Sequence, residues 1–436
     1  MPDPDDIQDY VEQRLTLGHE DRSFEVKGPL NLTDKAHRAK VARAAMAMGN
    51  LRDGGFICIG IDETRMREML PGLDDTEFEQ WSDFDNVSDA LARYCEPPLT
   101  FTRHPLTLSN GVKVVVLAVA EFDDVPHVCK RDSQGELHRG AVYVRPRGKP
   151  ESVPVPSAAD MRDLLDLAIT KGVREFVRRA GQAGIPLGLA PAPEDVDQEA
   201  YRAEAARAWG EPSQVMADIL AAGHTDVAVR PAAFDAGRVD PAKLERFLLD
   251  HTVRLRGWPV PFVDDGAGRH RYPGAVGQDI EPRVVPHSEA WRLCTSGQFL
   301  HRRVLVSDLR HLEQAQPTDP SSTGVVVVWD VLLYMVEVAE LGARMATALE
   351  VDHVAFDVTL SGIANRELVS GDWQRELHGP YRMASNELET QLGVSTTRLV
   401  ADTRTVGVEL AQGLLRQFGL GVPDQVLFDW QEQVFH

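Results

Sequence analysis

Residues 20–27, which read EDRSFEVK, and residues 56–61, which read FICIGI, decide the fold of the first part of this chain. Apolar and polar residues alternate in the first stretch, which is typical of a half-buried strand. The second stretch is a continuous apolar run, as expected of a strand buried on both faces. The Ala- and Met-rich residues 34–48 between them predict a helix with Thr33 or Asp34 as its N-cap.

Further elements flank this strand–helix–strand core. Apolar residues at helical spacing predict helices over residues 7–17 and 78–94. Apolar runs predict additional strands over residues 112–120 and 143–145. Because helices and strands are mixed in this order, we expect an α+β fold for a first domain that covers residues 1–155.

The remainder of the chain is predicted to form a second domain behind a linker. Closely spaced prolines end the first domain, and a helix over residues 158–180 leads into a Gly/Pro-rich stretch, so residues 156–195 are assigned to the connection. Residues 196–436 are expected to be mostly helical, with residues 331–349 as the core helix and residues 264–286 as a long loop. We can assign no chemistry to this domain, and expect it to act as a sensor or a dimerisation module.

Composition limits the functional classes. The chain has 46 Lys and Arg against 67 Asp and Glu, for a formal net charge of −21. This excess of acid excludes a protein coated in basic surface, but a few aimed basic residues still suffice to bind nucleic acid. Four scattered cysteines do not form a disulfide framework, and neither a secretory leader nor a membrane span is recognisable. We therefore expect a cytoplasmic protein with reduced thiols.

Three carboxylates bracket the two decisive strands. Glu20 and Glu25 lie five residues apart around the first strand, and Asp62 follows the second. If the two strands are neighbours, these side chains can converge at one edge of the sheet. Such a cluster suits Mg²⁺ or Mn²⁺, which can activate water beside a scissile phosphate, and Lys27 can add a positive charge there. An alternative is that the carboxylates face solvent in a binding domain without catalysis.

The ordered set of motifs resembles the AlbA-like domain of the Schlafen family. The set comprises E-x-x-x-x-E-φ-K, a helix, a turn from Asn50 to Gly54-Gly55, an apolar strand ending in G-φ-D, and the later Pro126-His127 and YVRPRG of residues 143–148. This resemblance covers about the first third of the chain. The turn is one residue longer than the family pattern, which puts its backbone shape in question.

The resemblance implies a function. Schlafen proteins bind nucleic acid, and some are metal-dependent endoribonucleases that cut tRNA or rRNA with a three-carboxylate site, which here falls on Glu20, Glu25 and Asp62. We therefore predict a Schlafen-like endoribonuclease with Mg²⁺ or Mn²⁺ and an expected role in bacterial antiphage defence. The alternative is a non-catalytic nucleic-acid-binding regulator with a C-terminal sensor. Since only one AlbA-like unit is visible, a homodimer is expected to complete the binding groove.

Basic residues provide the candidate nucleic-acid contacts, with RNA favoured over DNA. The predicted contacts are Lys27, Arg38, Lys130, Arg131, Arg139, Arg145, Arg147 and Lys149. Most of them fall in the segment that resembles the closing hairpin of the family domain. A solvated hairpin without a ligand is the alternative explanation for this cluster.

Three other patterns in the sequence each allow a functional and a purely structural interpretation. Animal Schlafens carry a zinc site in the region of Cys95, His127, Cys129 and His138, but the spacing here favours buried cysteines and surface histidines over a structural zinc. Residues 387–399 resemble a helix-turn-helix phrase, with two packed helices as the alternative. Trp258 and Trp291 are expected in the core, and without a Walker phosphate loop no nucleotide or organic cofactor is predicted.

Overall fold

The computed structural model describes residues 4–133, 135–147, 149–182, 197–264, 269–280, 287–309, 315–371, 377 and 379–434. The chain divides into two compact units, Met1–Phe176 and Val177–Phe435. The division falls inside the helix predicted over residues 158–180, whereas the Gly/Pro-rich stretch that follows that helix lies mostly outside the described residues.

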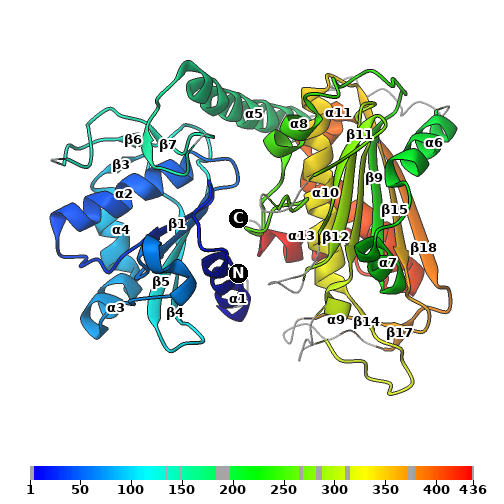
Figure 1. Cartoon of the computed structure of the whole chain (residues 1–436), viewed down its shortest axis with the longest axis horizontal. Helices are drawn as coiled ribbons and strands as arrows, with labels where there is room; N and C mark the ends of the chain where they lie inside the picture. Colours follow the sequence, from blue (N-terminus) through cyan, green and yellow to red (C-terminus); the bar gives the residue numbers. More distant parts are fainter. Residues whose placement is uncertain are drawn as a thin grey trace. The chain divides into compact units, whose positions relative to one another are not determined.

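Unit 1 is built on a four-stranded sheet in the order β1-β2-β5-β4 (Figure 1). Its strands are β1 (Phe24–Lys27), β2 (Gly55–Ile59), β4 (Phe101–Thr107) and β5 (Lys113–Val119). β1 and β2 run parallel with Glu25 opposite Ile57, while β5 pairs antiparallel with β2 and with β4. The two strands predicted from residues 20–27 and 56–61 are therefore neighbours, and β1 is an edge strand.

Helices cover both faces of this sheet. On one face, α1 (Pro4–Leu17) packs Ile7, Val11 and Leu15 against alternate residues of the strands, among them Phe24 and Cys58. On the other, α2 (Lys35–Gly49), α3 (Asp75–Ser82) and α4 (Phe84–Ala92) cover the intervening residues of β2 and β5. Residues 56–61 are continuously apolar because both faces of β2 are buried.

The predicted helices of unit 1 are confirmed with one change. Asp34 is the N-cap of α2, because its carboxylate accepts hydrogen bonds from the backbone N–H groups of Ala36 and His37. The helix predicted over residues 78–94 is instead the pair α3 and α4. Asp83 separates them in an extended conformation and caps α4 through the N–H of Asn86. An Asp at this position favours a helix start over a helix interior.

Short elements close unit 1. They are the 3₁₀ helix η1 (Glu63–Glu68), the strand pair β3 (Cys95–Glu96) and β6 (Val128–Cys129), and the pair β7 (Tyr143–Val144) and β8 (Val153–Pro154). α5 (Ala158–Gln182) then begins at the predicted position and packs Leu164 and Leu167 against Phe122 and Val144.

Unit 2 contains a seven-stranded antiparallel sheet, so the expectation of a mostly helical C-terminal domain is wrong. In spatial order the strands are β10 (His270–Tyr272), β11 (Ala275–Ile280), β12 (Glu289–Cys294), β13 (Phe299–Val304), β9 (His224–Pro231), β15 (His353–Ser361) and β18 (Glu387–Ser395). A smaller sheet joins β14 (Val325–Val327), β16 (Glu367–Val369) and β17 (Tyr381–Arg382). The predicted loop over residues 264–286 contains β10 and β11.

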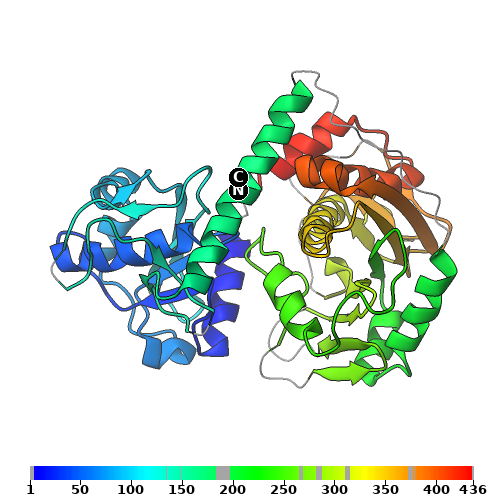
Figure 2. The same cartoon turned by 90° about the horizontal axis from the view of Figure 1, so that it is seen from above.

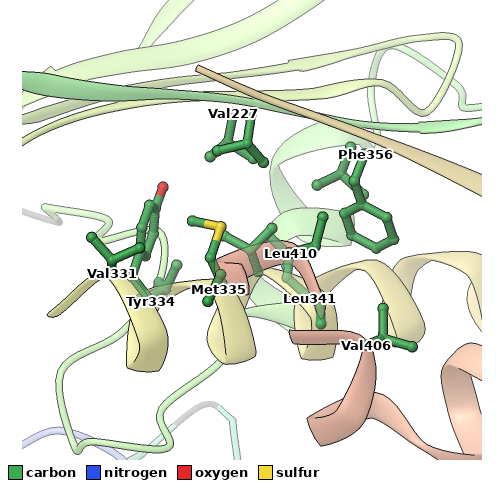
Figure 3. Close-up of a cluster of buried hydrophobic side chains, with 14 of the residues drawn as sticks. Val227, Val331, Tyr334, Met335, Leu341, Phe356, Val406 and Leu410 are labelled. Atoms are coloured by element: carbon green, nitrogen blue, oxygen red, sulfur yellow. The ribbon is translucent and has the colours of Figure 1, made fainter. Parts of the chain in front are cut away.

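The predicted core helix of unit 2 is confirmed as α10 (Val328–Ala348), which is buried without a break from Asp330 to Ala346. Figure 2 shows this helix enclosed by the sheet and by helices that follow it in the chain. Val227 of β9 and Phe356 of β15 contact one side of α10, and Val406 and Leu410 of α12 contact another (Figure 3). A helix that is buried on every side needs such an enclosed position for its apolar residues and partners for its few charged ones.

The other helices of unit 2 surround this core. They are α6 (Gln198–Trp209), α7 (Gln214–Ala221), α8 (Leu244–His251), α9 (Val306–Leu309), α11 (Thr396–Ala401), α12 (Thr403–Leu415), η2 (Arg416–Phe418) and α13 (Asp424–Glu432). α6 and α7 pack on sheet residues such as Ala290 and Leu300, which alternate with those that face α10. Trp291 is buried in the core, as predicted, and Trp258 is half-buried.

A buried polar cluster runs beside α10. The carboxylate of Glu289 contacts the imidazole of His287 and lies 3.4 Å from the Nε2 atom of His301, and the Nδ1 atom of His301 is 2.7 Å from the hydroxyl of Tyr334. Next to these residues, Asp330 pairs with Arg303 at 2.7 Å and with Arg256 at 3.5 Å. Arg256 also pairs with Glu337. Asp330 and Glu337 in this cluster are thus matched by the positive charges of Arg303 and Arg256.

The helix-turn-helix interpretation of residues 387–399, and the alternative of two packed helices, are both wrong. Residues 387–395 form β18, which pairs along its whole length with β15. Leu388 and Val394 are buried on one face, consistent with an alternation of apolar and polar residues at period two. Ser395 then caps α11, because its side chain accepts a hydrogen bond from the backbone N–H of Arg398.

Candidate functional site

The candidate site begins on the edge strand β1. Because Phe24 and Val26 face α1, strand alternation places Glu25 and Lys27 together on the opposite face. Glu25 is 4% exposed, and its Oε1 atom forms an ion pair with Lys27. Its Oε2 atom accepts from Arg145 and, at 2.8 Å, from the hydroxyl of Ser152. Both oxygens of Glu25 are therefore in use.

Arg145, directly after β7, supplies the central cation of this cluster. Its side chain is fully buried and lies between the two glutamates, pairing with Glu25 and lying 3.6 Å from Glu20. It also donates to the backbone carbonyl of Asp21 at 2.6 Å, while its own carbonyl accepts from the Nε atom of Arg22 at 2.6 Å. These contacts bind the segment after β7 to the start of β1.

Glu20 is the carboxylate of the cluster whose protonation changes near neutral pH. Its Oε1 atom accepts from the backbone N–H of Val26 at 2.8 Å. Burial, together with the negative charge of Glu25, raises the pKa of Glu20 from 4.5 to about 7, against the opposing effects of the hydrogen bond, Lys27 and Arg145. Glu25 differs: burial acts to raise its pKa, but the charges of Lys27 and Arg145 and the hydrogen bonds outweigh burial and lower it. One carboxylate thus titrates near neutrality while the other stays ionised.

Asp62 lies beyond the end of β2, beside the backbone of Gly28. A Cβ atom added at Gly28 would lie 2.6 Å from the Oδ1 atom of Asp62, so this position favours glycine. The described contacts of Glu20 and Glu25 are with Lys27, Arg145, Ser152 and backbone groups, and none joins either glutamate to Asp62. The structure therefore brings two of the three predicted carboxylates together around an arginine.

The arrangement does not fit a divalent metal. Within the described ranges, no group of three or more His, Cys, Asp or Glu side chains is placed to hold a metal ion. At the cluster itself, the charge of Glu25 is already matched by Lys27 and Arg145, which occupy the positions that a cation would take. The predicted Mg²⁺ or Mn²⁺ site remains a prediction without a ligand set.

Asn50 links the chain just before β6 to β7 and was not among the predicted site residues. Its side-chain amide donates to the carbonyls of His127 and Tyr143, both at 2.9 Å, and its Oδ1 atom accepts from the N–H of His127 at 2.7 Å. The longer turn that follows is accommodated by left-handed φ values of 67° at Asp53 and 69° at Gly54. Asn50 directly follows α2, and its place in the Asn-to-Gly-Gly motif was the available signal.

A basic loop connects β6 to β7. Lys130, Arg131 and Arg139 are exposed on this loop. Glu136 of the same loop pairs with Arg43 of α2 at 2.8 Å and lies 4.0 Å from Lys40. Among these side chains and Asp132, five are basic and two are acidic, although the whole chain carries a large excess of acid. The loop leads directly through β7 into Arg145.

The other predicted basic contacts are distributed differently. Arg38 donates to the backbone carbonyls of Leu32 and Thr33 before α2, and Lys27 pairs with Glu25. Arg147 is exposed and donates to Asp163 at 2.8 Å, and the exposed Lys149 lies 3.8 Å from Glu151. Because Arg145 is buried, its geometry favours a positioning role over the predicted phosphate contact.

The cysteine and histidine residues considered for zinc lie around β3 and β6. Cys95 is directly opposite Cys129 in this strand pair, and both thiols are free and buried. They donate to backbone carbonyls, Cys95 to Pro97 and Cys129 to Arg131. Burial raises the pKa of Cys95 to about 12, which disfavours the thiolate that a zinc ion binds.

Comparisons with known proteins bear on this first unit. Residues 20–153 match the family model described as Schlafen, AlbA_2, which confirms the resemblance seen in the N-terminal third. No curated protein matches the chain. Among solved structures, the chain is similar to the DIP2311 protein from Corynebacterium diphtheriae, with a TM-score of 0.25 and 14% identity. That similarity covers 35% of this chain and 27% of the other. In the described part of the chain, no helix has the length and apolar character needed to cross a membrane.

Proposed function

We propose that the Schlafen AlbA-like domain binds nucleic acid through the loop between β6 and β7, with Lys130, Arg131 and Arg139 contacting phosphates. The observation that carries this proposal is the exposure of all three side chains on one loop of an otherwise acidic chain. Basic side chains on a common loop supply the electrostatic, sequence-independent part of nucleic-acid affinity. The family match supports a nucleic-acid ligand.

The buried cluster then acts by positioning this loop. Arg145 contacts the side chains of Glu20 and Glu25 and donates a hydrogen bond to the backbone carbonyl of Asp21. Asn50 forms hydrogen bonds with His127 before the loop and with Tyr143 after it. The loop thus leaves and enters the domain at fixed points. A preorganised loop loses less conformational entropy when it binds a ligand. We favour RNA as the ligand and treat single-stranded and duplex DNA as the alternatives.

Binding is tested by fluorescence anisotropy with labelled single-stranded RNA, duplex RNA and DNA at several salt concentrations. The Lys130→Ala, Arg131→Ala, Arg139→Ala triple variant is expected to bind at least ~10-fold more weakly at low salt and to lower the salt slope by about 2. The matched control removes three basic residues elsewhere in unit 1: Arg65, Arg67 and Lys113. Equal binding by the triple variant and the wild type would contradict the proposal.

The endoribonuclease prediction is the finer alternative within the same family. It is supported by the proximity of Glu20 to Glu25 and by the pKa of Glu20 near 7, since perturbed carboxyl groups cluster at functional sites. The ion pairs of Glu25 with Lys27 and Arg145 count against endoribonuclease activity, because they occupy both oxygens of this carboxylate. A cleavage assay on tRNA with Mg²⁺, Mn²⁺ or EDTA tests it, and activity must then depend on Glu25 and Asp62.

A further inference from the structure

The side chain of Glu136 joins the basic loop between β6 and β7 to helix α2. Its Oε2 atom lies 2.8 Å from the guanidinium of Arg43, and its Oε1 atom lies 4.0 Å from the ammonium of Lys40. Lys40 and Arg43 are three residues apart, so they project from the same face of α2. One carboxylate therefore lies between two cations, and the three side chains together keep a net positive charge.

The ion pairs of Glu136 lack well-aligned hydrogen bonds. The Oε2 atom is buried, yet within the described part of the chain no N–H or O–H group is aligned to donate a hydrogen bond to it. The ammonium of Lys40 is beyond hydrogen-bond distance from Oε1. The side chains of Lys40 and Arg43 are 43% and 31% exposed, so a ligand can reach both. Another anion can therefore replace the carboxylate at modest cost.

The backbone of the loop is fixed by other contacts. Leu137 is buried in the core of unit 1. The backbone groups of Ser133 and Leu137 form two hydrogen bonds with each other, of 2.9 and 3.0 Å. The hydroxyl of Tyr143 accepts from the backbone N–H of His138 at 2.9 Å. Because these contacts lie on both sides of Glu136, its side chain can leave α2 while the loop keeps its shape.

A phosphodiester has the same features that Glu136 presents to the two cations. Both anions carry one negative charge shared by two oxygens, and Arg and Lys bind either of them. We propose that Glu136 occupies a phosphate site formed by Lys40 and Arg43, and that a phosphate of bound RNA displaces it. This inference rests on the proposed binding of nucleic acid by the loop. It adds two phosphate contacts on α2 and one residue that masks them in the free protein.

RNA binding measured by fluorescence anisotropy tests the masking. Glu136→Gln keeps the size of the side chain and removes its charge, so we expect it to bind single-stranded RNA about 5-fold more tightly than the wild type. The Lys40→Ala, Arg43→Ala variant should bind more weakly and lower the salt slope by about 1, for one lost phosphate. In that background, Glu136→Gln should give no gain, because the masked site is absent. An equal gain in both backgrounds, or none in either, would overturn the proposal.

Glu68→Gln is the matched control for net charge. Glu68 pairs with Arg65 at 2.9 Å on η1, so this variant also removes one negative charge and releases one arginine of unit 1. We expect it to bind RNA as the wild type does. A gain equal to that of Glu136→Gln would show an effect of net charge alone and overturn the proposal.

Hydrogen exchange tests whether the loop keeps its shape. Peptides that contain Leu137 and Tyr143 should be equally protected in the wild type and in Glu136→Gln. Tighter binding together with a loss of this protection would assign the gain to a loosened loop and overturn the proposal.

The same binding measurements separate this inference from the proposed function. If RNA binding depends on the exposed basic residues of the loop but is unchanged in Glu136→Gln and in Lys40→Ala, Arg43→Ala, the loop binds RNA and the masking is wrong. If neither the wild type nor Glu136→Gln binds RNA, the proposed function itself is wrong.

Discussion

The two units each bury a cluster of charged residues. We call the cluster of unit 2 balanced because its contacts outweigh burial at Glu289, and the cluster of unit 1 unbalanced because burial outweighs the contacts at Glu20. In unit 2, the carboxylate of Glu289 contacts His287 and His301 and accepts a hydrogen bond from the backbone N–H of Phe262. These contacts hold the pKa of Glu289 well below its usual range, although burial alone would raise it. In unit 1, burial and the negative charge of Glu25 raise the pKa of Glu20 to about 7, although Arg145 lies 3.6 Å away and opposes this increase. A balanced cluster stabilises a core, whereas an unbalanced one is retained at the expense of stability and is the better candidate for function.

Breaking the balanced cluster should have the largest effect. Glu289→Ala leaves the buried His301, the half-buried His287 and the backbone N–H of Phe262 without their carboxylate partner, so the free energy of unfolding of unit 2 should fall by about 3–5 kcal/mol. Urea denaturation followed by tryptophan fluorescence measures this, because Trp291 lies in the same core. Glu389→Ala on the exposed side of β18 is the control and should change stability little. A loss of less than ~1 kcal/mol at Glu289 would show that the cluster is not a stabilising element.

Breaking the unit 1 cluster should have a somewhat smaller effect. Arg145→Ala removes the cation shared by Glu20 and Glu25, and we expect a loss of about 2–4 kcal/mol, reduced because Glu20 can take up a proton. Hydrogen exchange of peptides from α2 and β2 reports on unit 1 within the full chain. Arg139→Ala on the exposed loop is the control. Unchanged protection in Arg145→Ala would contradict a positioning role for this residue.

The pH dependence of stability distinguishes the two clusters. Because the folded-state pKa of Glu20 is raised from 4.5 to about 7, its protonated form stabilises the fold below about pH 4.5, and this contribution is lost as the pH rises through 7. Relative to Glu20→Gln, the wild type should therefore lose about 2 kcal/mol of stability between about pH 5 and about pH 8. The same hydrogen-exchange peptides measure it. A difference that does not vary with pH would contradict an unbalanced Glu20.

The smallest effect is expected far from both clusters. Arg398, which lies in the segment that resembles a helix-turn-helix phrase, pairs with Glu409 at a partly exposed position. Arg398→Ala should reduce stability by less than ~1 kcal/mol and leave nucleic-acid binding unchanged. Anisotropy measurements and thermal unfolding of the same preparation check both points. A large loss of DNA affinity would restore a recognition role to α11.

The sequence predicted unit 1 better than unit 2 for a physical reason. In unit 1 the alternation of β1, the apolar run of β2 and the Ala-rich composition of α2 indicated where these elements lie, whereas the adjacency of β1 and β2 was left open. In unit 2, β12 (EAWRLC) and β13 (FLHRRV) contain charged residues that are buried in pairs, such as Glu289 with His301. Such charged residues interrupt the apolar pattern expected of a core strand. Their burial could not be predicted, because their partners lie on another strand.

The candidate site was only partly predictable for a related reason. The motif spacing identified Glu20, Glu25 and Arg145, and the structure joins all three. Sequence alone assigned Arg145 to the surface, because an arginine near a turn is usually exposed. Its burial depends on β7 returning to the start of β1 more than a hundred residues away, a contact that no local pattern encodes.

RNA binding and RNA integrity, measured in the same samples, test most directly the claim that the unit 1 cluster positions a binding loop. Labelled tRNA is incubated with the wild type in Mg²⁺, Mn²⁺ or EDTA, and anisotropy and a denaturing gel are recorded together. We predict salt-sensitive binding that depends on Lys130, Arg131 and Arg139, with the RNA intact in every condition. Metal-dependent cleavage that disappears in the Glu25→Ala, Asp62→Ala variant would contradict the account and establish these carboxylates as catalytic.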